Sequence, residues 1–175
     1  MKRFVDSNIL CRFANRADPQ HAETRQALDL AIGQGDVLLI SPQVEREFWV
    51  VATRPRDRNG LGMAPAEVEA SLKAWREAFF TFVPDSSAVH EAWRDLVNRH
   101  AVSGKPAHDA GIAAAAKTAR ADQILTFNAE DYRRFEPEIA ISTPQELIQE
   151  HDRRLALEQQ AAQQPSRDLD QDIER

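Results

Sequence analysis

Oxygen-bearing side chains stand at four places: just past the first expected strand, within the helix that follows the second strand, at the start of the alanine-rich helix, and after the strand that ends at Thr126. Carboxylate and amide oxygens are hard ligands that suit Mg²⁺ and Mn²⁺. In open parallel sheets, ligands bind beyond the carboxyl ends of the strands, where the strand order reverses. The spacing therefore allows a divalent-cation site, and such a site can act on a phosphodiester. The residues are Asp6, Glu47, Asp109, Asn128 and Asp131.

Each of these residues also fits a purely structural role. Asp6 and Asp109 stand at expected helix starts, where aspartate is a favoured N-cap. Glu47 taken alone suits an exposed helix surface, and Asn128 suits a turn. Asp131 would interact favourably with a helix N-terminus. Spacing alone therefore leaves both interpretations open.

Two features of the sequence favour the site. Glu47 stands between Glu45 and Phe48, beside an otherwise apolar helix face, where a solvated acid is less expected. Asp109 is followed by AGIAAAA, and such small residues allow backbones to approach closely around a site. His108, just before Asp109, is a candidate general base or a neighbour that orients the acid, and we favour the second role.

Motifs of other catalytic chemistries are absent from the sequence. There is no HExxH or other zinc spacing, no GxSxG, and no GxGxxG or P-loop. The single cysteine, Cys11, lies in an apolar stripe, so thiol catalysis has no support and an intrachain disulfide is impossible. Trp49, Trp75 and Trp93 lie among apolar helix positions and are interpreted as core residues rather than base-stacking platforms.

Strands and helices alternate along the chain, which predicts a three-layer α/β domain with a mainly parallel sheet. Apolar runs predict strands at 3–5, 37–40, 81–83, 123–126 and 139–141. Helices are expected to begin near Ser7, Pro19, Ser41, Pro65, Ser86 and Asp109, with loops at 53–63 and 102–106. We expect one domain over 1–145, and then a polar helix and a disordered tail over 146–175.

Composition limits the class of protein. The chain has 175 residues and a net charge of −6, which does not match a protein that grips nucleic acid through a broad basic face. Acids around a cation can still act on a phosphodiester while the surface stays acidic. No apolar run approaches the roughly 20 residues of a membrane helix, and Asp6 interrupts any signal-peptide core. We therefore expect a cytoplasmic protein with no membrane span.

Four segments together resemble the PIN-domain family, and specifically the VapC-type toxins of bacterial toxin–antitoxin pairs. The resemblance covers about residues 3–143 and rests on the order and intervals of the segments. It implies a three-layer α/β/α fold and a metal-dependent ribonuclease. The segments are FVDSNIL, QVEREFWVVATRP with NGLGM, GKPAHDAGIAAAA, and ILTFNAEDYRRF.

The resemblance also implies which residues form the site. Asp6, Glu47 and Asp109 match the three acids that surround Mg²⁺ or Mn²⁺ in this family. Ser7 and Asn8 match the polar pair beside the first acid, and Ser7 is expected to support that acid by hydrogen bonding. Glu47 is preferred over its neighbouring acid because it matches the family's acid before phenylalanine.

The fourth position departs from the common family pattern. This chain has Asn128 where many members have aspartate, and Asp131 follows three residues later. We assign the fourth position to Asn128, with Asp131 as a supporting residue and as the alternative. An amide oxygen can coordinate a cation but adds no charge, so we expect weak metal affinity and higher activity with Mn²⁺ than with Mg²⁺.

The resemblance implies an endoribonuclease toxin with RNA as substrate, a VapB-like antitoxin as partner, and a homodimer. The alternative is a catalytically inactive PIN-like module that binds RNA or a protein. A haloacid-dehalogenase-like phosphohydrolase is disfavoured because DSN stands in place of DxDxT. Arg54, Arg56 and Arg58 in the loop 53–63 are candidates for gripping the RNA backbone, or form a solvated basic loop.

Overall fold

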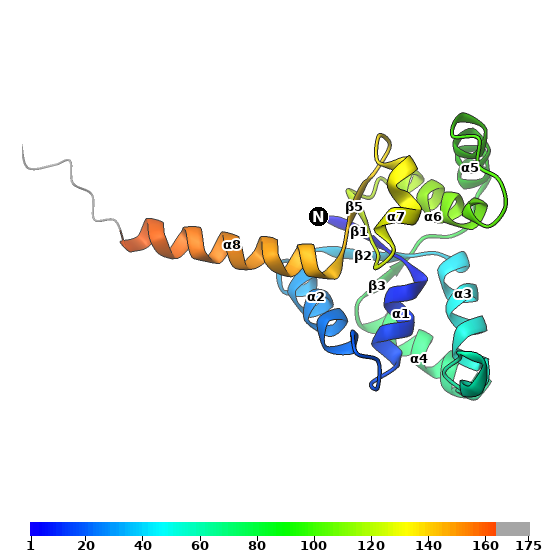
Figure 1. The fold of residues 1–175 in the computed structure, drawn as a ribbon, viewed down its shortest axis with the longest axis horizontal. Helices are drawn as coiled ribbons and strands as arrows, with labels where there is room; N and C mark the ends of the chain where they lie inside the picture. The colour runs from blue at the N-terminus through cyan, green and yellow to red at the C-terminus, as the bar shows by residue number, and fades with distance from the viewer. Residues whose placement is uncertain (164–175) are drawn as a thin grey trace, which may run out of the picture.

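Five short strands form one sheet at the centre of this computed structural model, which describes residues 1–163 (Figure 1). The strand order is β3-β2-β1-β4-β5, and every neighbouring pair runs parallel. The predicted α/β class with a mainly parallel sheet is therefore confirmed. The strands are β1 Lys2–Val5, β2 Val37–Ile40, β3 Phe80–Phe82, β4 Gln123–Leu125 and β5 Ala140–Ser142.

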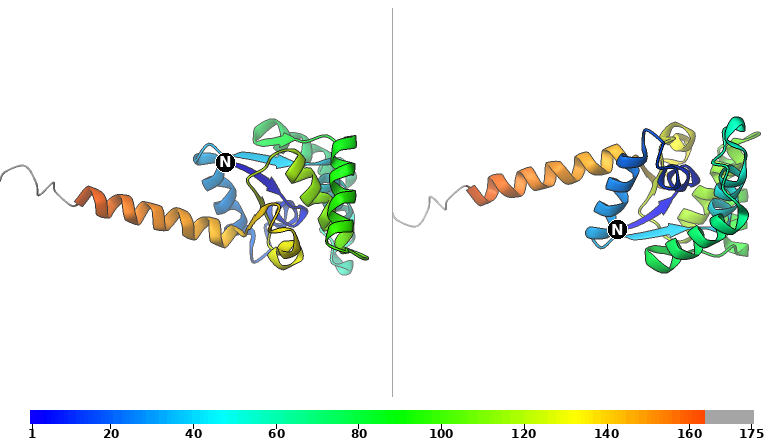
Figure 2. Two further views of the ribbon diagram at one scale, coloured as in Figure 1. Left: turned by 90° about the horizontal axis from the view of Figure 1, so that it is seen from above. Right: turned by 90° about the horizontal axis from the view of Figure 1, so that it is seen from below.

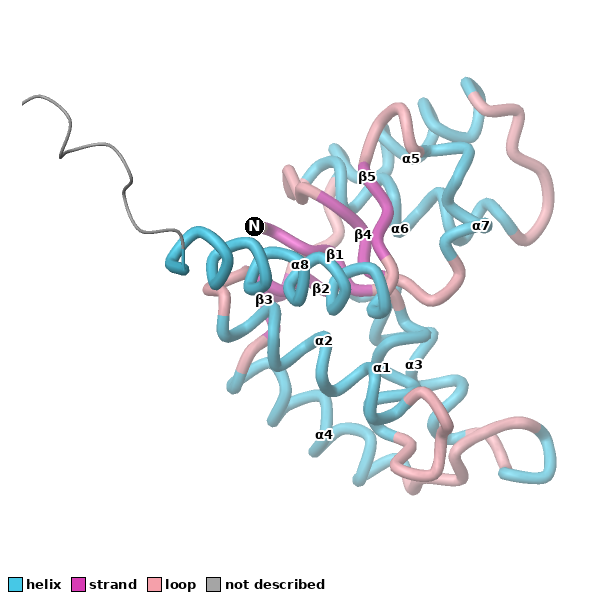
Figure 3. The backbone as a smooth tube through the Cα atoms, turned by 60° about the vertical axis from the view of Figure 1, so that its left-hand side comes forward, coloured by secondary structure: helices cyan, strands magenta, loops and turns pink. Residues whose placement is uncertain are grey.

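Helices cover both faces of the sheet, with α1–α4 on one side and α5–α7 on the other (Figure 3). The chain steps outward from β1 to β3 and then crosses back past β1 to β4. Because crossovers between parallel strands are right-handed, this reversal moves the later helices to the opposite face. The helices are α1 Ser7–Ala14, α2 His21–Gly33, α3 Pro42–Thr53, α4 Pro65–Ala78, α5 Ser87–Arg99, α6 Pro106–Thr118, α7 Ala129–Tyr132 and α8 Pro144–Gln163.

The strand order reverses between β1 and β4, so the carboxyl ends of these two strands lie side by side. Val5 is paired with Leu125, and the main-chain nitrogen of Asp6 donates to the oxygen of Leu125 at 3.1 Å. The next residue after β4 is Thr126, which therefore faces Asp6. Open α/β sheets bind their ligands at such a reversal, so the fold places Asp6 where a site is expected.

Small and apolar residues hold the two helical layers against the sheet. Phe4 and Ile124 on neighbouring strands are fully buried, and the alanines of α6 lie against the core with little exposure. The three tryptophans pack against this core, as predicted, and the indole of Trp93 donates to the oxygen of Ala107 at 2.9 Å. Close packing of α6 is what brings its first turn to the end of the sheet.

Helix α6 begins three residues earlier than the sequence pattern predicts, at Pro106. Proline is favoured at the first position of a helix, and this start signal outweighs the loop predicted for 102–106. Asp109 therefore lies within the first turns of α6 and is not its N-cap. Asp6 occupies the N-cap position of α1 but makes no side-chain capping bond. The prediction that Asp109 is an N-cap is therefore wrong. Asp6 is an N-cap by position, but capping does not explain what its carboxylate does, because that group makes no capping hydrogen bond.

Helix α8 starts on the domain and then leaves it. Its first turns pack beside α2, and Leu147 is 2% exposed within the core. Beyond that point the helix projects away from the body (Figures 1 and 2), and residues 152–162 are exposed. The predicted disordered tail falls partly on 164–175, outside the described residues. No helix within 1–163 combines the length and apolar character that crossing a bilayer requires.

Removing residues 159–175 should lower the melting temperature by no more than a few degrees, because the side chains of 159–162 contact little of the domain. Thermal unfolding of the shortened and full chains measures the difference. Leu147→Ala in the full chain is the positive control and should cost about 2–4 kcal/mol, because it removes a core side chain. A truncation as costly as Leu147→Ala would show that the removed segment docks on the domain.

Candidate metal and active site

Asp6 is a carboxylate buried at the end of the central strand, with 5% of its surface exposed. Its Oδ2 accepts hydrogen bonds from Thr126 Oγ1 at 2.7 Å and from Asn8 Nδ2 at 2.6 Å. Its Oδ1 lies 3.2 Å from Ser7 Oγ. Burial nevertheless raises the pKa of Asp6, the nearby charge of Glu47 raises it further, and the hydrogen bonds offset only part of this. The site therefore favours a positive charge or a proton beside Asp6.

Asn8 and Thr126 join the start of α1 to the end of β4. Asn8 Nδ2 also donates to Thr126 Oγ1 at 2.8 Å, and Asn8 Oδ1 accepts from the main-chain nitrogen of Phe127 at 3.1 Å. The polar pair expected beside Asp6 is thus in contact with it. The sequence predicts Thr126 only as the last residue of a strand, and its hydroxyl becomes a recognisable site feature only once β1 and β4 are known to be neighbours.

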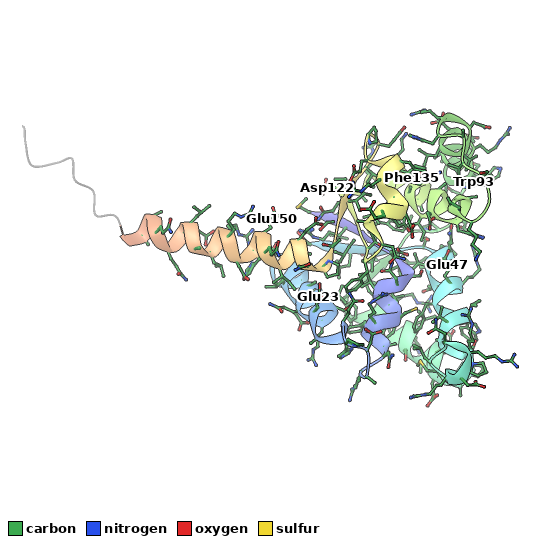
Figure 4. The ribbon with its side chains drawn as sticks, viewed as in Figure 1. Glu23, Glu47, Trp93, Asp122, Phe135 and Glu150 are labelled. Atoms are coloured by element: carbon green, nitrogen blue, oxygen red, sulfur yellow. The ribbon has the colours of Figure 1, made fainter. Side chains whose placement is uncertain are left out.

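Glu47 reaches the same place from α3 and is labelled in Figure 4. Ser7 Oγ lies 2.7 Å from Glu47 Oε2, so one hydroxyl bridges the carboxylates of Asp6 and Glu47. The neighbouring acid Glu45 instead lies 3.2 Å from Arg76 on α4. The structure therefore brings Glu47, rather than Glu45, to Asp6.

Gln43 is a site residue that the sequence analysis does not predict. Its Nε2 donates to Glu47 Oε1 at 2.8 Å and to the main-chain oxygen of His108 at 2.7 Å, so it ties α3 to the first turn of α6. A Cβ atom on Gly111 would lie 2.3 Å from Gln43 Oε1. The expectation that small residues after Asp109 permit close approach is met at Gly111. The available signal was the spacing of Gln43, one helical turn before Glu47.

Asp109 lies half-buried on α6 and faces other acids. Burial raises its pKa to about 6, and repulsion from Asp131, Asp6 and Glu47 contributes in that order. Within residues 1–163, no hydrogen bond or ion pair engages the carboxylate of Asp109 or of Asp131. Glu47, Asp109 and Asp131 share a cavity of about 540 Å³ with Lys105. These acids carry more negative charge than the surrounding residues compensate.

The two candidates for the fourth position have different surroundings. Asn128 is exposed at the N-cap of α7, and its main-chain nitrogen donates to Thr126 Oγ1 at 3.0 Å. Its side chain forms no hydrogen bond with any residue in the described range. Asp131 lies in the first turn of α7 and is the charge that most affects Asp109. Both residues are exposed, and they differ in that Asp131 carries a charge that acts on Asp109, whereas the side chain of Asn128 forms no hydrogen bond within residues 1–163.

The three candidate RNA-binding arginines also differ. Arg54 lines a cavity of about 610 Å³ together with Ser7 and Glu47, so it borders the acids directly. Arg56 Nε donates to the main-chain oxygen of Leu61 at 3.1 Å within its own loop, and Arg58 is exposed on the same turn of 3₁₀ helix. The basic loop therefore offers one guanidinium, that of Arg54, at the edge of the site.

The sequence from 3 to 136 matches the family model of the PIN domain. The chain belongs to the PIN domain family. The matched range includes all five candidate oxygen ligands. It confirms the predicted resemblance to the PIN-domain family. No curated protein matches the chain in sequence.

Solved structures with a similar fold share little sequence with this PIN domain. VapBC2 of Rickettsia felis, bound to a DNA fragment from its promoter, has a TM-score of 0.61 at 16% identity, covering 82% of this chain and 98% of that one. VapBC-1 of nontypeable Haemophilus influenzae has a TM-score of 0.61 at 14% identity, covering 83% and 99%. VapC20 of Mycobacterium tuberculosis, described as a toxin that cleaves the sarcin-ricin loop, has a TM-score of 0.52 at 18% identity, covering 70% and 86%.

The donor set of this PIN domain suits a hard divalent cation, although the acids do not converge. Within residues 1–163, no three Asp, Glu, His or Cys side chains lie close enough together to hold one ion. The acids form two pairs instead. Asp6 and Glu47 are joined through the hydroxyl of Ser7, and Asp131 is the charge that acts most strongly on Asp109. All their donors are oxygens, and the raised pKa values of Asp6 and Asp109 reflect uncompensated burial and repulsion. Mg²⁺ usually keeps several waters and binds through one or two carboxylates, so this spacing fits.

The raised pKa of Asp109 predicts how the metal-free protein responds to pH. The folded state holds this proton more tightly than the unfolded state, whose pKa is near 3.8. The resulting stability is complete below about pH 4 and is lost as the pH rises to about 6. Asp109→Asn removes the charge, so the variant should be more stable than the wild type at pH 7, by about 1 kcal/mol after allowing for solvent screening.

Thermal unfolding in EDTA at pH 7.0 and pH 4.5 measures this effect. At pH 7.0 the melting temperature of Asp109→Asn should exceed that of the wild type by about 2–4 °C, and the gap should close at pH 4.5. Asp152→Asn, on the exposed part of α8, is the matched control and should change neither value. Equal destabilisation by Asp109→Asn at both pH values would contradict the repulsion argued for these acids.

Proposed function

We propose that this PIN domain is an endoribonuclease that depends on Mg²⁺ or Mn²⁺ and serves as the toxin of a toxin–antitoxin pair. The observation that carries the proposal is the buried Asp6 at the reversal of the sheet, joined to Glu47 through Ser7, with the half-buried Asp109 on the neighbouring helix α6. A PIN fold with this acidic edge suits hydrolysis of a phosphodiester with a divalent cation. VapBC2, VapBC-1 and the toxin VapC20 share the fold, which supports the assignment.

Asp6, Glu47, Asp109 and Asp131 would hold the cation, directly or through water. When bound, a divalent cation polarises the scissile phosphate and lowers the pKa of a nearby water. Ser7, by bridging Asp6 and Glu47, fixes the separation of these two carboxylates. We assign no base role to the imidazole of His108, whose main-chain oxygen accepts from Gln43 beside the acids.

Supporting contacts keep the acids in place. Thr126 and Asn8 hold one oxygen of Asp6 through hydrogen bonds, so its other oxygen remains directed toward Ser7 and Glu47. Gln43 holds one oxygen of Glu47 and anchors it to the main chain of α6. Orientation by such neighbours is the usual way in which proteins tune a metal-binding carboxylate.

Basic side chains on both sides of the acids would receive the RNA backbone. Arg54 borders Ser7 and Glu47 in one cavity, and Lys105 borders Asp109 in the adjoining one. Phosphates on either side of the cleaved bond would contact these two cations, while the acids remain reserved for the metal. Arg56 and Arg58 lie farther along the same loop, where they would contact RNA more weakly.

A VapB-like antitoxin is the proposed protein partner, acting in the cytoplasm where RNA is available. Several solved neighbours with this fold are VapBC or FitAB assemblies, such as VapBC-1, which supports a partner of this kind. An antitoxin arginine would pair in bidentate fashion with the uncompensated carboxylates of Asp109 and Asp131. A homodimer of this chain is part of the same proposal.

A second candidate is a catalytically inactive PIN module that binds RNA or a protein. The observation that favours it is the wide spacing of the acids, none of which form a set of three ligands within 1–163. The two candidates differ in whether RNA is cut when Mn²⁺ is added, so one assay separates them.

Asp109→Asn should reduce Mn²⁺-dependent cleavage of labelled RNA by more than about 100-fold, the upper range for loss of a mere supporting residue. The variant removes a ligand charge but keeps the size of the side chain, so its melting temperature in EDTA should not fall. Asp152→Asn is the control with unchanged cleavage. Sequencing of RNA ends after expression gives the target. Absence of metal-dependent cleavage by the wild-type chain would favour the inactive module.

The surroundings of α7 predict that Asp131, rather than Asn128, completes the site. Asp131→Asn should weaken Mn²⁺ binding several-fold in a calorimetric titration, because it removes the charge that acts most strongly on Asp109. Asn128→Ala should change the affinity little, since its side chain carries no charge and forms no hydrogen bond with any residue in the described range. The reverse order of effects would assign the fourth position to Asn128.

A further inference from the structure

Tyr132 buries a hydroxyl group that has no partner among the described residues. It is the one tyrosine of the sequence and the last residue of α7, and 1% of its surface is exposed. Within residues 1–163, no donor or acceptor completes a hydrogen bond with its Oη. Buried polar atoms in folded proteins nearly always have a partner, so this hydroxyl requires an explanation.

The hydroxyl lies among the acids of the site. It is close enough to Asp6 to interact with it, although no full hydrogen bond forms. Burial raises the pKa of Tyr132 well above its ordinary value, and the charges of Asp6, Asp109 and Glu47 raise it further. The phenol therefore keeps its proton near neutral pH, and it is available as a donor.

Asp6 does not need this donor. Its Oδ2 already accepts from Thr126 and Asn8, and its Oδ1 faces Ser7. Packing does not need it either, because a phenylalanine at 132 would fill the same space without burying an unpartnered hydroxyl. The feature left to explain is one buried proton donor without a partner, next to Asp6 and one residue after Asp131, both of which suit a hydrated cation.

We propose that Tyr132 is a positioning residue of the acidic site, whose hydroxyl donates to the hydration shell of a divalent cation held by the carboxylates. This inference rests on the proposed function. Mg²⁺ keeps most of its water in protein sites, so a buried donor beside the acids has an acceptor when the cation is bound. Tyr132 thereby acts through the cation and does not touch the RNA.

Tyr132→Phe tests the inference by separating stability from cation binding. In EDTA the variant should melt at the same temperature as the wild type or higher, because it loses an unpartnered buried group. Its affinity for Mn²⁺, measured by calorimetry, should fall about 3- to 10-fold, in the range seen on loss of outer-shell partners. If Tyr132 had only a structural role, Tyr132→Phe would change the melting temperature and leave the Mn²⁺ affinity unchanged.

Ser41→Ala is the matched control. Ser41 is also buried, and its hydroxyl also has no partner in the described part of the chain, but it is not among the groups that act on Asp6 or Asp109. The Ser41→Ala variant should bind Mn²⁺ with the same affinity as the wild type. An equal effect of Ser41→Ala and Tyr132→Phe on that affinity would overturn the inference.

Because the chain has one tyrosine, a ζ-¹³C label on tyrosine gives a single NMR signal beside the hydroxyl. Addition of Mg²⁺ should shift this signal in the wild type and not in Asp109→Asn. If the wild type binds Mn²⁺ and cleaves RNA while Tyr132→Phe binds Mn²⁺ equally well, the role of Tyr132 is refuted and the proposed function stands. If the wild type binds no divalent cation, both are refuted.

Discussion

A carboxylate buried at the end of a central strand has to be satisfied, and the edge of this sheet is arranged around that need. Burying an ionised group is costly unless hydrogen bonds and opposite charge replace water. Asp6 receives hydrogen bonds from Asn8, two residues along the chain, and from Thr126, which is available because β1 and β4 are neighbours at the reversal of the strand order. Hydrogen bonds alone do not restore its ordinary pKa. A positive charge beside Asp6 would stabilise its ionised carboxylate further, and this makes the edge of the sheet a candidate metal site.

The sequence predicts the framework of this edge because the framework follows from local signals. The continuous apolar run of β2 and the residues of β1 indicate buried parallel strands, and residues that follow such strands gather at one edge. The positions of Asp6 and Glu47 follow from that rule. The start of α6 could not be predicted in the same way. The glycine before Pro106 indicates a loop, whereas the proline itself favours the start of a helix. Three residues of error were enough to make Asp109 look like a cap.

Other parts of the site depend on contacts that no local pattern contains. Gln43 serves the site because α3 passes α6 at Gly111, where a side chain would collide with it. Tyr132 could be predicted as a buried aromatic residue, but the direction of its hydroxyl depends on how α7 packs beside Asp6. The choice between Asn128 and Asp131 depends on the same packing, since a one-turn helix can present either residue to the acids. These choices are set by tertiary structure, after the strand order is known.

The uncompensated acids also connect the two proposed activities of the chain. Like charges held together by a rigid fold destabilise it, and proteins retain such an arrangement mainly where a ligand repays the cost. A cation would relieve the repulsion between Asp109 and Asp131, and so would an arginine from an antitoxin. Because both would satisfy the same carboxylates, the two would compete for one site. Inhibition would then require no separate regulatory surface, because the carboxylates proposed to bind the cation are the ones that the proposed antitoxin would neutralise.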